Sequence, residues 1–234
     1  MIEQPSPDRK KQITGYLARE VLSLLGMAVA LFWAAGRLDW LPGWGALAVM
    51  AGWEAATAIL VIFIKPELLP ERLNPKKDTP KWDVAIVSLL GLVTLFQYIA
   101  AGLDQRYGWS SGFAPAVQAA AFVLSAAGYA WFTWATYVNA FFSRTVRLQT
   151  DRGQAVVSGG PYRLMRHPAY LGALVYELAV SVMLASWPSF AFGVLAAALL
   201  ILRTALEDRL LRADLPGYAD YAARVRFRLF PGIW

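Results

Sequence analysis

The sequence predicts an all-α integral membrane protein, built as a bundle of about six membrane-embedded helices. Hydrophobic residues make up 58% of the 234 residues and charged residues only 16%, whereas a soluble domain is usually about a quarter charged. The apolar residues also fall in long blocks, as helices that cross a bilayer require. The basic residues gather in alternate connections between these blocks, which is typical of a membrane topology.

Six apolar segments are predicted to form the embedded helices, in chain order 16–36, 43–64, 82–101, 114–142, 168–185 and 188–202. Because further apolar segments follow it, the first is an uncleaved span rather than a signal peptide. The last two are near the lower limit of about 17 residues for crossing a bilayer, so they are either short spans or a helical hairpin. The tail, 203–234, is expected to start as a charged continuation of the last helix. The chain then divides into a four-helix membrane region, 1–142, and a C-terminal region, 143–234.

The placement of basic residues predicts the orientation. All but two of the 22 Lys and Arg residues lie in the N-terminal segment, in the connections after the second and fourth apolar segments, or in the C-terminal tail. Arg37 and Arg106 remain for the opposite side. The positive-inside rule places both termini in the cytoplasm, in the inner membrane if the source is bacterial. Basicity is therefore a topology signal, and no nucleic-acid partner is expected.

A polar stretch, 158–172, lies between apolar segments and contains the single histidine. Two glycines and a proline favour a turn. Pro168 suits the first position of a new helix, so Arg166 and His167 precede a helix N-terminus, where unpaired N–H groups favour an anion. The stretch is either a cradle for a carboxylate or phosphate, or a basic interface loop closed by a helix-starting proline.

Other residue types narrow the chemistry. With no Cys and one His, disulfides, thiolate nucleophiles and Cys- or poly-His-ligated metals are excluded, and no metal is expected. Ser–His–carboxylate hydrolysis lacks a nucleophile elbow. Glu54 and Glu177 fall within apolar segments, where a carboxylate is costly unless it is paired or protonated. These two residues are the best support for a non-enzymatic membrane scaffold or transporter.

Three motifs together resemble the isoprenylcysteine carboxyl methyltransferase family: Gly160-Pro-Tyr-Arg-Leu-Met-Arg-His-Pro-Ala-Tyr-Leu-Gly172, Arg203-Thr-Ala-Leu-Glu-Asp208 and Tyr218-Ala-Asp-Tyr221. The same pattern runs through the wider group of membrane phospholipid methyltransferases. The resemblance covers about 139–234, and the first four predicted spans carry no matching motif. It identifies 143–234 as a methyltransferase-like region, with a cytoplasmic cofactor site formed by the Arg-His-Pro loop and the C-terminal tail.

The resemblance implies S-adenosyl-L-methionine as cofactor and a lipophilic acceptor that arrives from the lipid bilayer. That acceptor is an isoprenylcysteine-like carboxylate, or another lipid or small amphipathic carboxylate, thiol or amine. The alternative from another class is an NADPH-dependent membrane reductase of the sterol reductase type. No additional basic cluster suited to a 2′-phosphate is present in the sequence.

The resemblance also implies roles for individual residues. The expected catalytic residues are Arg166, Arg203 and Glu207. The expected cofactor-binding residues are Tyr162, Arg166, His167, Pro168, Tyr170, Gly172, Glu207, Tyr218 and Tyr221. The expected acceptor-binding residues are Asn139, Glu177 and Arg203. Glu177 is included because it shares a face of the fifth predicted helix with Tyr170, and the alternative is a buried carboxylate that is hydrogen-bonded to a neighbouring hydroxyl. Methyl transfer is an in-line displacement, so alignment and exclusion of water matter more than proton transfer.

Charge complementarity gives these roles a chemical basis. Arg166 and His167, with the helix start that follows them, suit the cofactor carboxylate, and Glu207 suits its ammonium. Arg203 is expected by analogy to orient an acceptor carboxylate. Successive helical positions differ in direction by about 100°, so Glu207 and Asp208 cannot face the same pocket. We expect Glu207 to face the cofactor and Asp208 to form an ordinary exposed pair with Arg212.

Overall fold

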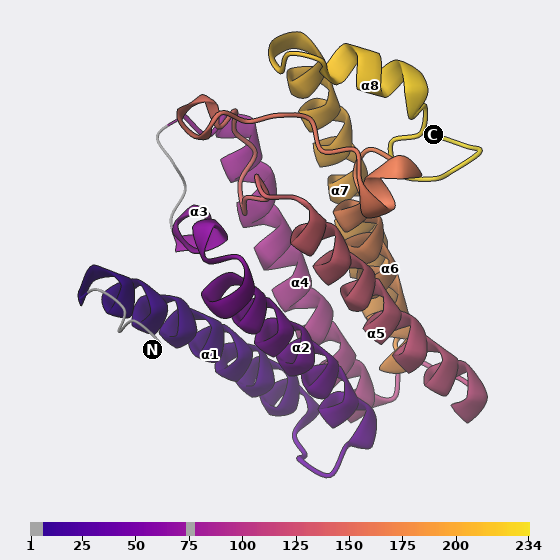
Figure 1. The fold of residues 1–234 in the computed structure, drawn as a ribbon. Coiled ribbons are helices and arrows are strands. Elements are labelled where there is room, and N and C mark those ends of the chain that lie inside the picture. Colours follow the sequence, from indigo (N-terminus) through magenta and orange to yellow (C-terminus); the bar gives the residue numbers. More distant parts are fainter. Residues whose placement is uncertain (1–6, 74–77) are drawn as a thin grey trace.

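The computed structural model describes residues 7–73 and 78–234, so Lys76 and Lys77, which the orientation prediction counts as cytoplasmic, lie outside the described residues. All regular structure in these residues is helical, which confirms the predicted fold class. The long helices are α1 (Pro7–Ala35), α2 (Leu41–Ile59), α4 (Lys81–Tyr107), α5 (Pro115–Val138), α6 (Pro168–Met183) and α7 (Trp187–Asp214) (Figure 1). The short ones are η1 (Leu60–Ile64), η2 (Pro66–Leu68), α3 (Leu69–Leu73), η3 (Thr150–Arg152), η4 (Gly160–Arg163) and α8 (Tyr218–Arg224).

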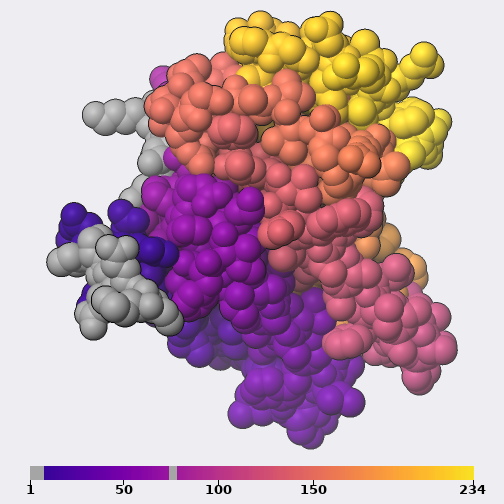
Figure 2. Space-filling model, viewed as in Figure 1, coloured from indigo at the N-terminus to yellow at the C-terminus, as the bar shows by residue number. Residues whose placement is uncertain are grey.

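The six long helices contact one another in a closed ring, in the order α1, α4, α7, α6, α5, α2 and back to α1. The short connections after α1, α4 and α6 lie together at one end of the bundle (Figure 1). The segment 139–167 and the C-terminal tail lie side by side over the opposite end (Figure 2). The two ends of the ring therefore differ in kind, because one is joined by tight turns and the other is covered by long polar segments.

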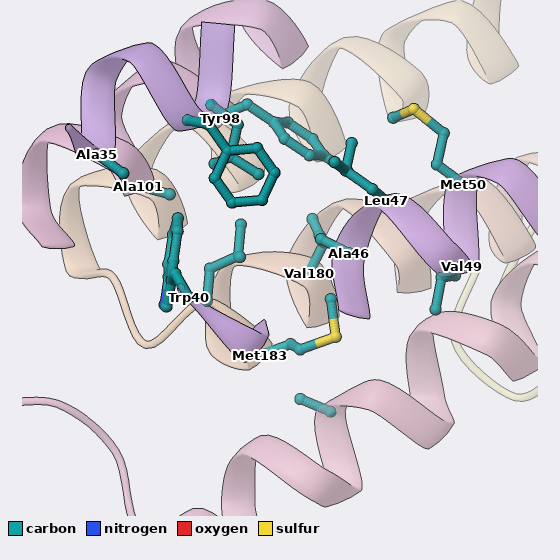
Figure 3. Packing of buried hydrophobic residues seen from close by; sticks show 14 of the residues in the cluster. Ala35, Trp40, Ala46, Leu47, Val49, Met50, Tyr98, Ala101, Val180 and Met183 are labelled. Atoms are coloured by element: carbon teal, nitrogen blue, oxygen red, sulfur yellow. The ribbon is translucent and has the colours of Figure 1, made fainter. Parts of the chain in front are cut away.

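A buried apolar core fills the end of the ring with the short connections (Figure 3). It includes Leu31, Phe32, Ala35, Trp40, Ala46, Leu47, Tyr98, Ala101, Val180 and Met183. The Tyr98 and Tyr176 hydroxyls are hydrogen-bonded within it. A Cβ at Gly102 would lie 2.5 Å from the Leu31 carbonyl oxygen, so only glycine allows α1 and α4 to approach this closely. Apolar side chains and the close approach of α1 and α4 therefore fill this half of the ring.

Helices α5 and α6 also meet through glycines. A Cβ at Gly172 would lie 2.5 Å from the carbonyl oxygen of Gly128, and one at Gly128 would lie 2.7 Å from that of Gly172. Helices in a membrane gain stability from such close backbone approach, because lipid gives little hydrophobic reason for them to associate. This contact fixes the start of α6, and with it the position of the Arg-His-Pro loop.

One predicted helix boundary is wrong. The fourth helix ends at Val138 rather than at 142, because the Asn139 side chain accepts a hydrogen bond from the Phe141 N–H (2.9 Å) and turns the chain. The last apolar segment continues as a charged helix through 203–214, as predicted for the start of the tail, so that α7 is 28 residues long. That stretch is rich in strong helix formers.

Five helices of the described chain are long and apolar enough to cross a membrane: α1, α2 with η1, α4, α5 and α7. Helix α6 is apolar but has only 16 residues, as predicted for that segment. The structure thus supports a multi-pass membrane protein with five long helices and one short embedded helix.

We expect the end that carries 139–167 and the tail to face the cytoplasm, because almost all basic residues belong to it. The chain has no native cysteine, so single cysteines can be labelled in sealed vesicles. Arg163, which is exposed, should react only from the cytoplasmic side as Arg163→Cys. Leu38, which is 67% exposed between α1 and α2, should react only from the opposite side as Leu38→Cys. The reverse pattern would overturn this orientation.

Candidate functional site

A cavity of about 470 Å³ occupies the half of the ring beneath the polar segments. All six long helices contribute to its wall, through the halves that point away from the apolar core. Its lining includes eight of the predicted site residues: Asn139, Tyr162, His167, Tyr170, Glu177, Glu207, Tyr218 and Tyr221. Arg166 and Arg203 border it as well. Segments far apart in the sequence therefore converge on one chamber.

Pro168 and Gly172, which were predicted to bind the cofactor, are not among the residues that line this cavity. Pro168 is the first residue of α6, and Gly172 packs against Gly128 in the α5–α6 interface. Both positions were selected because they belong to the motif. Their roles in the structure are to start a helix and to admit a neighbouring backbone.

Glu207 provides an acidic group in the cavity wall. Its Oε2 accepts a hydrogen bond from the Tyr170 hydroxyl (2.5 Å), and the side chain is 22% exposed. The His167 Nδ1 lies 4.0 Å from the same oxygen, and the His167 and Tyr170 rings stack with centroids 5.9 Å apart. Among the described residues, no arginine or lysine pairs with Glu207 at this site. The cavity therefore presents a carboxylate whose charge is free to meet a cation.

Asp208 was expected to be exposed, and this is wrong because its side chain is fully buried. It does pair with Arg212 (3.1 Å), as predicted. It also accepts hydrogen bonds from Arg166 (2.6 and 3.1 Å) and Arg228 (2.9 Å). The Tyr218 hydroxyl donates a further bond (3.1 Å). The carboxylate thus ties α7 to the Arg-His-Pro loop and to the C-terminal tail, although Asp208 itself is not among the residues that line the cavity.

Arg166 was expected to meet a cofactor carboxylate, but the structure occupies most of its guanidinium with internal partners. Besides its two bonds to Asp208, it donates to the Val225 and Arg226 carbonyl oxygens (2.7 and 2.8 Å). Four of the five N–H donors of an arginine are thereby used. The Arg166 and His167 N–H groups also donate to Phe227 and Arg228 carbonyls. The carbonyl oxygens of the C-terminal tail therefore occupy the donors of Arg166 and His167 that were predicted to bind an anion.

Arg203 lies in the cavity wall with its charge already paired. Its Nε and Nη2 donate to the Asp83 carboxylate (2.7 and 3.3 Å), and Nη2 also donates to the Arg144 carbonyl (2.9 Å). The Arg203 guanidinium also lies over the Tyr170 ring, with its central carbon 5.2 Å from the ring centroid. Asp83 is fully buried and also accepts the Val146 N–H (2.7 Å). Asp83 was not among the predicted site residues, because its only signal in the sequence is an acidic residue in the first turn of an apolar helix.

Aromatic residues line the part of the cavity beneath the tail. The Tyr218 and Tyr221 rings meet edge to face, with centroids 5.5 Å apart, and pack with Leu211, Leu215 and Val156. Burial, then the Asp208 and Glu207 charges, raise the pKa of Tyr218. The hydroxyl therefore stays protonated and can donate to Asp208. An apolar slot with flat rings suits a planar heterocycle.

Tyr162 and Asn139 form a polar pair in the wall beside this slot. The Asn139 amide donates to the Tyr162 hydroxyl (3.1 Å), and the Tyr162 carbonyl oxygen accepts the Tyr221 hydroxyl (2.7 Å). Burial raises the pKa of Tyr162, so this phenol is neutral. The pair connects the end of α5 to α8, which places the tail over the cavity.

The cavity extends along the helices toward the apolar core, where Met27, Met50 and Trp53 line it. Glu54 and Glu177 belong to this part of the wall. The Thr94 hydroxyl donates to Glu177 Oε1 (3.3 Å), as expected for a buried carboxylate near a hydroxyl. The chamber therefore passes from a polar aromatic end to a largely apolar end within the embedded helices.

These features define a multi-pass membrane protein with a chamber inside the helix ring, capped by a histidine-containing loop and an aromatic tail. Residues 119–213 match the model of the isoprenylcysteine carboxyl methyltransferase (ICMT) family. The family resemblance predicted from the motifs is confirmed where the two overlap, 139–213. The match also includes most of the fourth helix, which was expected to carry no matching motif, and it ends before Tyr218. The match indicates a membrane methyltransferase as the class of protein.

One curated relative is the cobalt-zinc-cadmium resistance protein CzcN of Cupriavidus metallidurans. It is 38% identical over 82 aligned residues, which cover 31% of this chain and 34% of the relative. The alignment thus spans about a third of the relative's length. In the described part of this chain, no group of three or more His, Asp or Glu side chains is arranged to hold a metal ion.

Proposed function

We propose that the protein is a membrane-embedded methyltransferase that uses S-adenosyl-L-methionine and methylates a lipophilic acceptor. The observation that carries the proposal is the convergence of the three motifs on one chamber. His167 and Tyr170, Glu207, and the Tyr218–Tyr221 pair border the same cavity although they lie up to 54 positions apart in the chain. That cavity continues into the apolar interior of the ring.

The wall contains groups that match the parts of the cofactor. Glu207 has a carboxylate without an arginine or lysine partner among the described residues, which fits an ammonium group. Tyr170 holds that carboxylate in place through its hydroxyl. Tyr218, Leu211 and Leu215 offer an apolar surface for adenine. When bound, the cofactor supplies an activated methyl group on its sulfonium.

The protein's own contribution is then to align the acceptor with the cofactor and to keep water away from both. Asp208 fixes the loop and the tail around the chamber, and Asp83 fixes Arg203 in its wall. The hydrogen bonds of Arg203 to Asp83 and to the Arg144 carbonyl come from its Nε and Nη2. The Nη1 donors can therefore orient an acceptor carboxylate while Arg203 stays paired with Asp83. The helix ring excludes water from the apolar end, which matters more for methyl transfer than a general base does.

The function predicts a preference for acceptors with an apolar tail. Purified protein in lipid nanodiscs is given radiolabelled S-adenosylmethionine with N-acetyl-S-farnesylcysteine or with N-acetyl-S-methylcysteine, which carry the same carboxylate. We expect the farnesyl compound to have a kcat/KM at least tenfold higher, because its tail can enter the apolar end of the chamber. Equal values would argue against entry from the bilayer. Oxidation of NADPH without methyl transfer would reject the methyltransferase and support the alternative, an NADPH-dependent membrane reductase.

A further inference from the structure

Arg72, in the short helix α3, is a buried arginine without a charge partner. The residue is 9% exposed and borders the cavity. Its Nε and Nη2 are buried and have no hydrogen-bond partner among the described residues. The guanidinium carbon lies 5.3 Å from the Phe142 ring centroid, which supports one face of the group. An unpaired buried cation is costly, so such a side chain favours an incoming anion.

Arg19 of α1 holds α3 in this position. Its Nη1 donates to the Arg72 and Leu73 carbonyl oxygens (2.6 and 3.0 Å). Its Nη2 pairs with Glu20 (2.6 Å), so the Glu20 carboxylate is already engaged. Glu20 and Tyr16 act on Arg72 only at a distance. The fixed backbone of α3 therefore presents Arg72 to the chamber, and the neighbouring carboxylate does not neutralise it directly.

Arg144 adds a second positive group to the same wall. It borders the cavity, and the charges of both Arg19 and Arg203 lower its pKa, after the larger effect of burial. Burial also lowers the pKa of the Arg72 guanidinium, to about 10, so Arg72 remains charged at neutral pH. This side of the chamber therefore carries three arginines, Arg19, Arg72 and Arg144, beside the carboxyl groups of Glu20 and Glu54.

We propose that Arg72, supported by Arg19 and Arg144, forms an anion subsite for the acidic headgroup, a carboxylate or a phosphate, of the amphiphilic acceptor. The inference rests on the proposed function, because it takes the bound amphiphile to be the methyl acceptor. Arg19 lies on α1 and Arg72 on α3, both outside residues 119–213, which match the methyltransferase family and include Arg144. The cofactor-matching groups come from α6, α7 and α8. The subsite therefore belongs to the second ligand of the chamber.

The test is equilibrium binding to purified protein in phosphatidylcholine nanodiscs, without methyl transfer. The probes are dodecanoate, dodecyl phosphate, methyl dodecanoate and inorganic phosphate. The variants are Arg72→Gln, Arg144→Gln and the matched control Arg163→Gln, which removes an exposed arginine from the same end of the bundle. Thermal unfolding checks that each variant is folded, and S-adenosylmethionine affinity is measured in parallel.

We expect the wild type to bind dodecanoate or dodecyl phosphate at least tenfold more tightly than methyl dodecanoate. Arg72→Gln should remove this preference and leave ester and S-adenosylmethionine affinity unchanged. Arg163→Gln should keep the preference. If Arg72→Gln does not fold, Arg144→Gln should still reduce the preference several-fold.

Three results would overturn the subsite. The first is equal affinity of the wild type for acid and ester. The second is inorganic phosphate binding as tightly as dodecyl phosphate, which would indicate a free-anion site. The third is loss of S-adenosylmethionine binding in Arg72→Gln, which would assign the anion to the cofactor. An Arg72-dependent acid preference in a protein that binds no S-adenosylmethionine would leave the subsite standing and reject the methyltransferase.

Discussion

Replacing Asp208 by Asn is expected to destabilise the protein by about 3–5 kcal/mol, because it removes the negative charge from a buried cluster of cations. Asp208 is fully buried and is the shared partner of Arg166, Arg212 and Arg228. Without that charge, Arg166 keeps its two backbone acceptors, Val225 and Arg226, and at most one neutral amide oxygen in place of the carboxylate. The tail and the loop would then lose their common anchor.

The measurement for Asp208→Asn is unfolding of the purified protein in detergent, with Asp214→Asn as the matched control. Asp214 is exposed on the same helix, so its substitution should change stability by less than about 0.5 kcal/mol. Because the anchor fixes the tail, Asp208→Asn should also expose the tail to limited proteolysis. A variant as stable as the control would mean that the cluster is not an anchor.

The second large effect is expected at Arg203, where Arg203→Gln should cost about 3–5 kcal/mol of stability by leaving the buried Asp83 carboxylate without its cation. Asp83→Asn should destabilise to a similar extent. Since both variants break one pair, the double variant should lose less than the sum of the two single losses. Arg209→Gln is the control, because Arg209 is exposed on the same helix.

This cycle also separates a structural role of Arg203 from a direct one. If Arg203 acts only through its position, methyl transfer and stability should fall together in Arg203→Gln and in Asp83→Asn. If Arg203 also orients the acceptor, Arg203→Gln should raise the KM for the acceptor beyond that of Asp83→Asn. Full stability of Arg203→Gln would contradict the pairing with Asp83 as a source of stability.

The helices were predictable because long apolar blocks leave few alternatives in a bilayer. The end of α5 was not. Asn139 stops α5 through a local side-chain bond. The charged continuation of α7 was predicted, but its partners elsewhere in the fold were not. Hydropathy detects the apolar stretch of a helix, whereas capping and distant pairing decide where that helix ends.

The site was predictable where motifs carry it and unpredictable where long-range pairing decides it. His167, Tyr170 and Glu207, which the family resemblance assigned to the cofactor site, all border the chamber. Asp208 appeared to be a surface residue, since its nearest visible partner in sequence was Arg212. Its other partners lie up to 42 positions away, and the Asp83–Arg203 pair spans 120 positions. The periodic patterns of a single sequence relate only neighbouring positions, so they do not predict contacts between residues this far apart.

The central claim is that the chamber binds S-adenosylmethionine through Glu207. The direct test is equilibrium binding of S-adenosylmethionine and of NADPH to purified wild type, Glu207→Gln and the control Glu67→Gln, an exposed glutamate outside the chamber. We predict binding of S-adenosylmethionine but not NADPH to the wild type. Glu207→Gln should weaken it tenfold or more, because a charge-assisted hydrogen bond to the ammonium is lost, and Glu67→Gln should not change it. Absence of S-adenosylmethionine binding to the folded wild type, or unchanged affinity in Glu207→Gln, would contradict the claim.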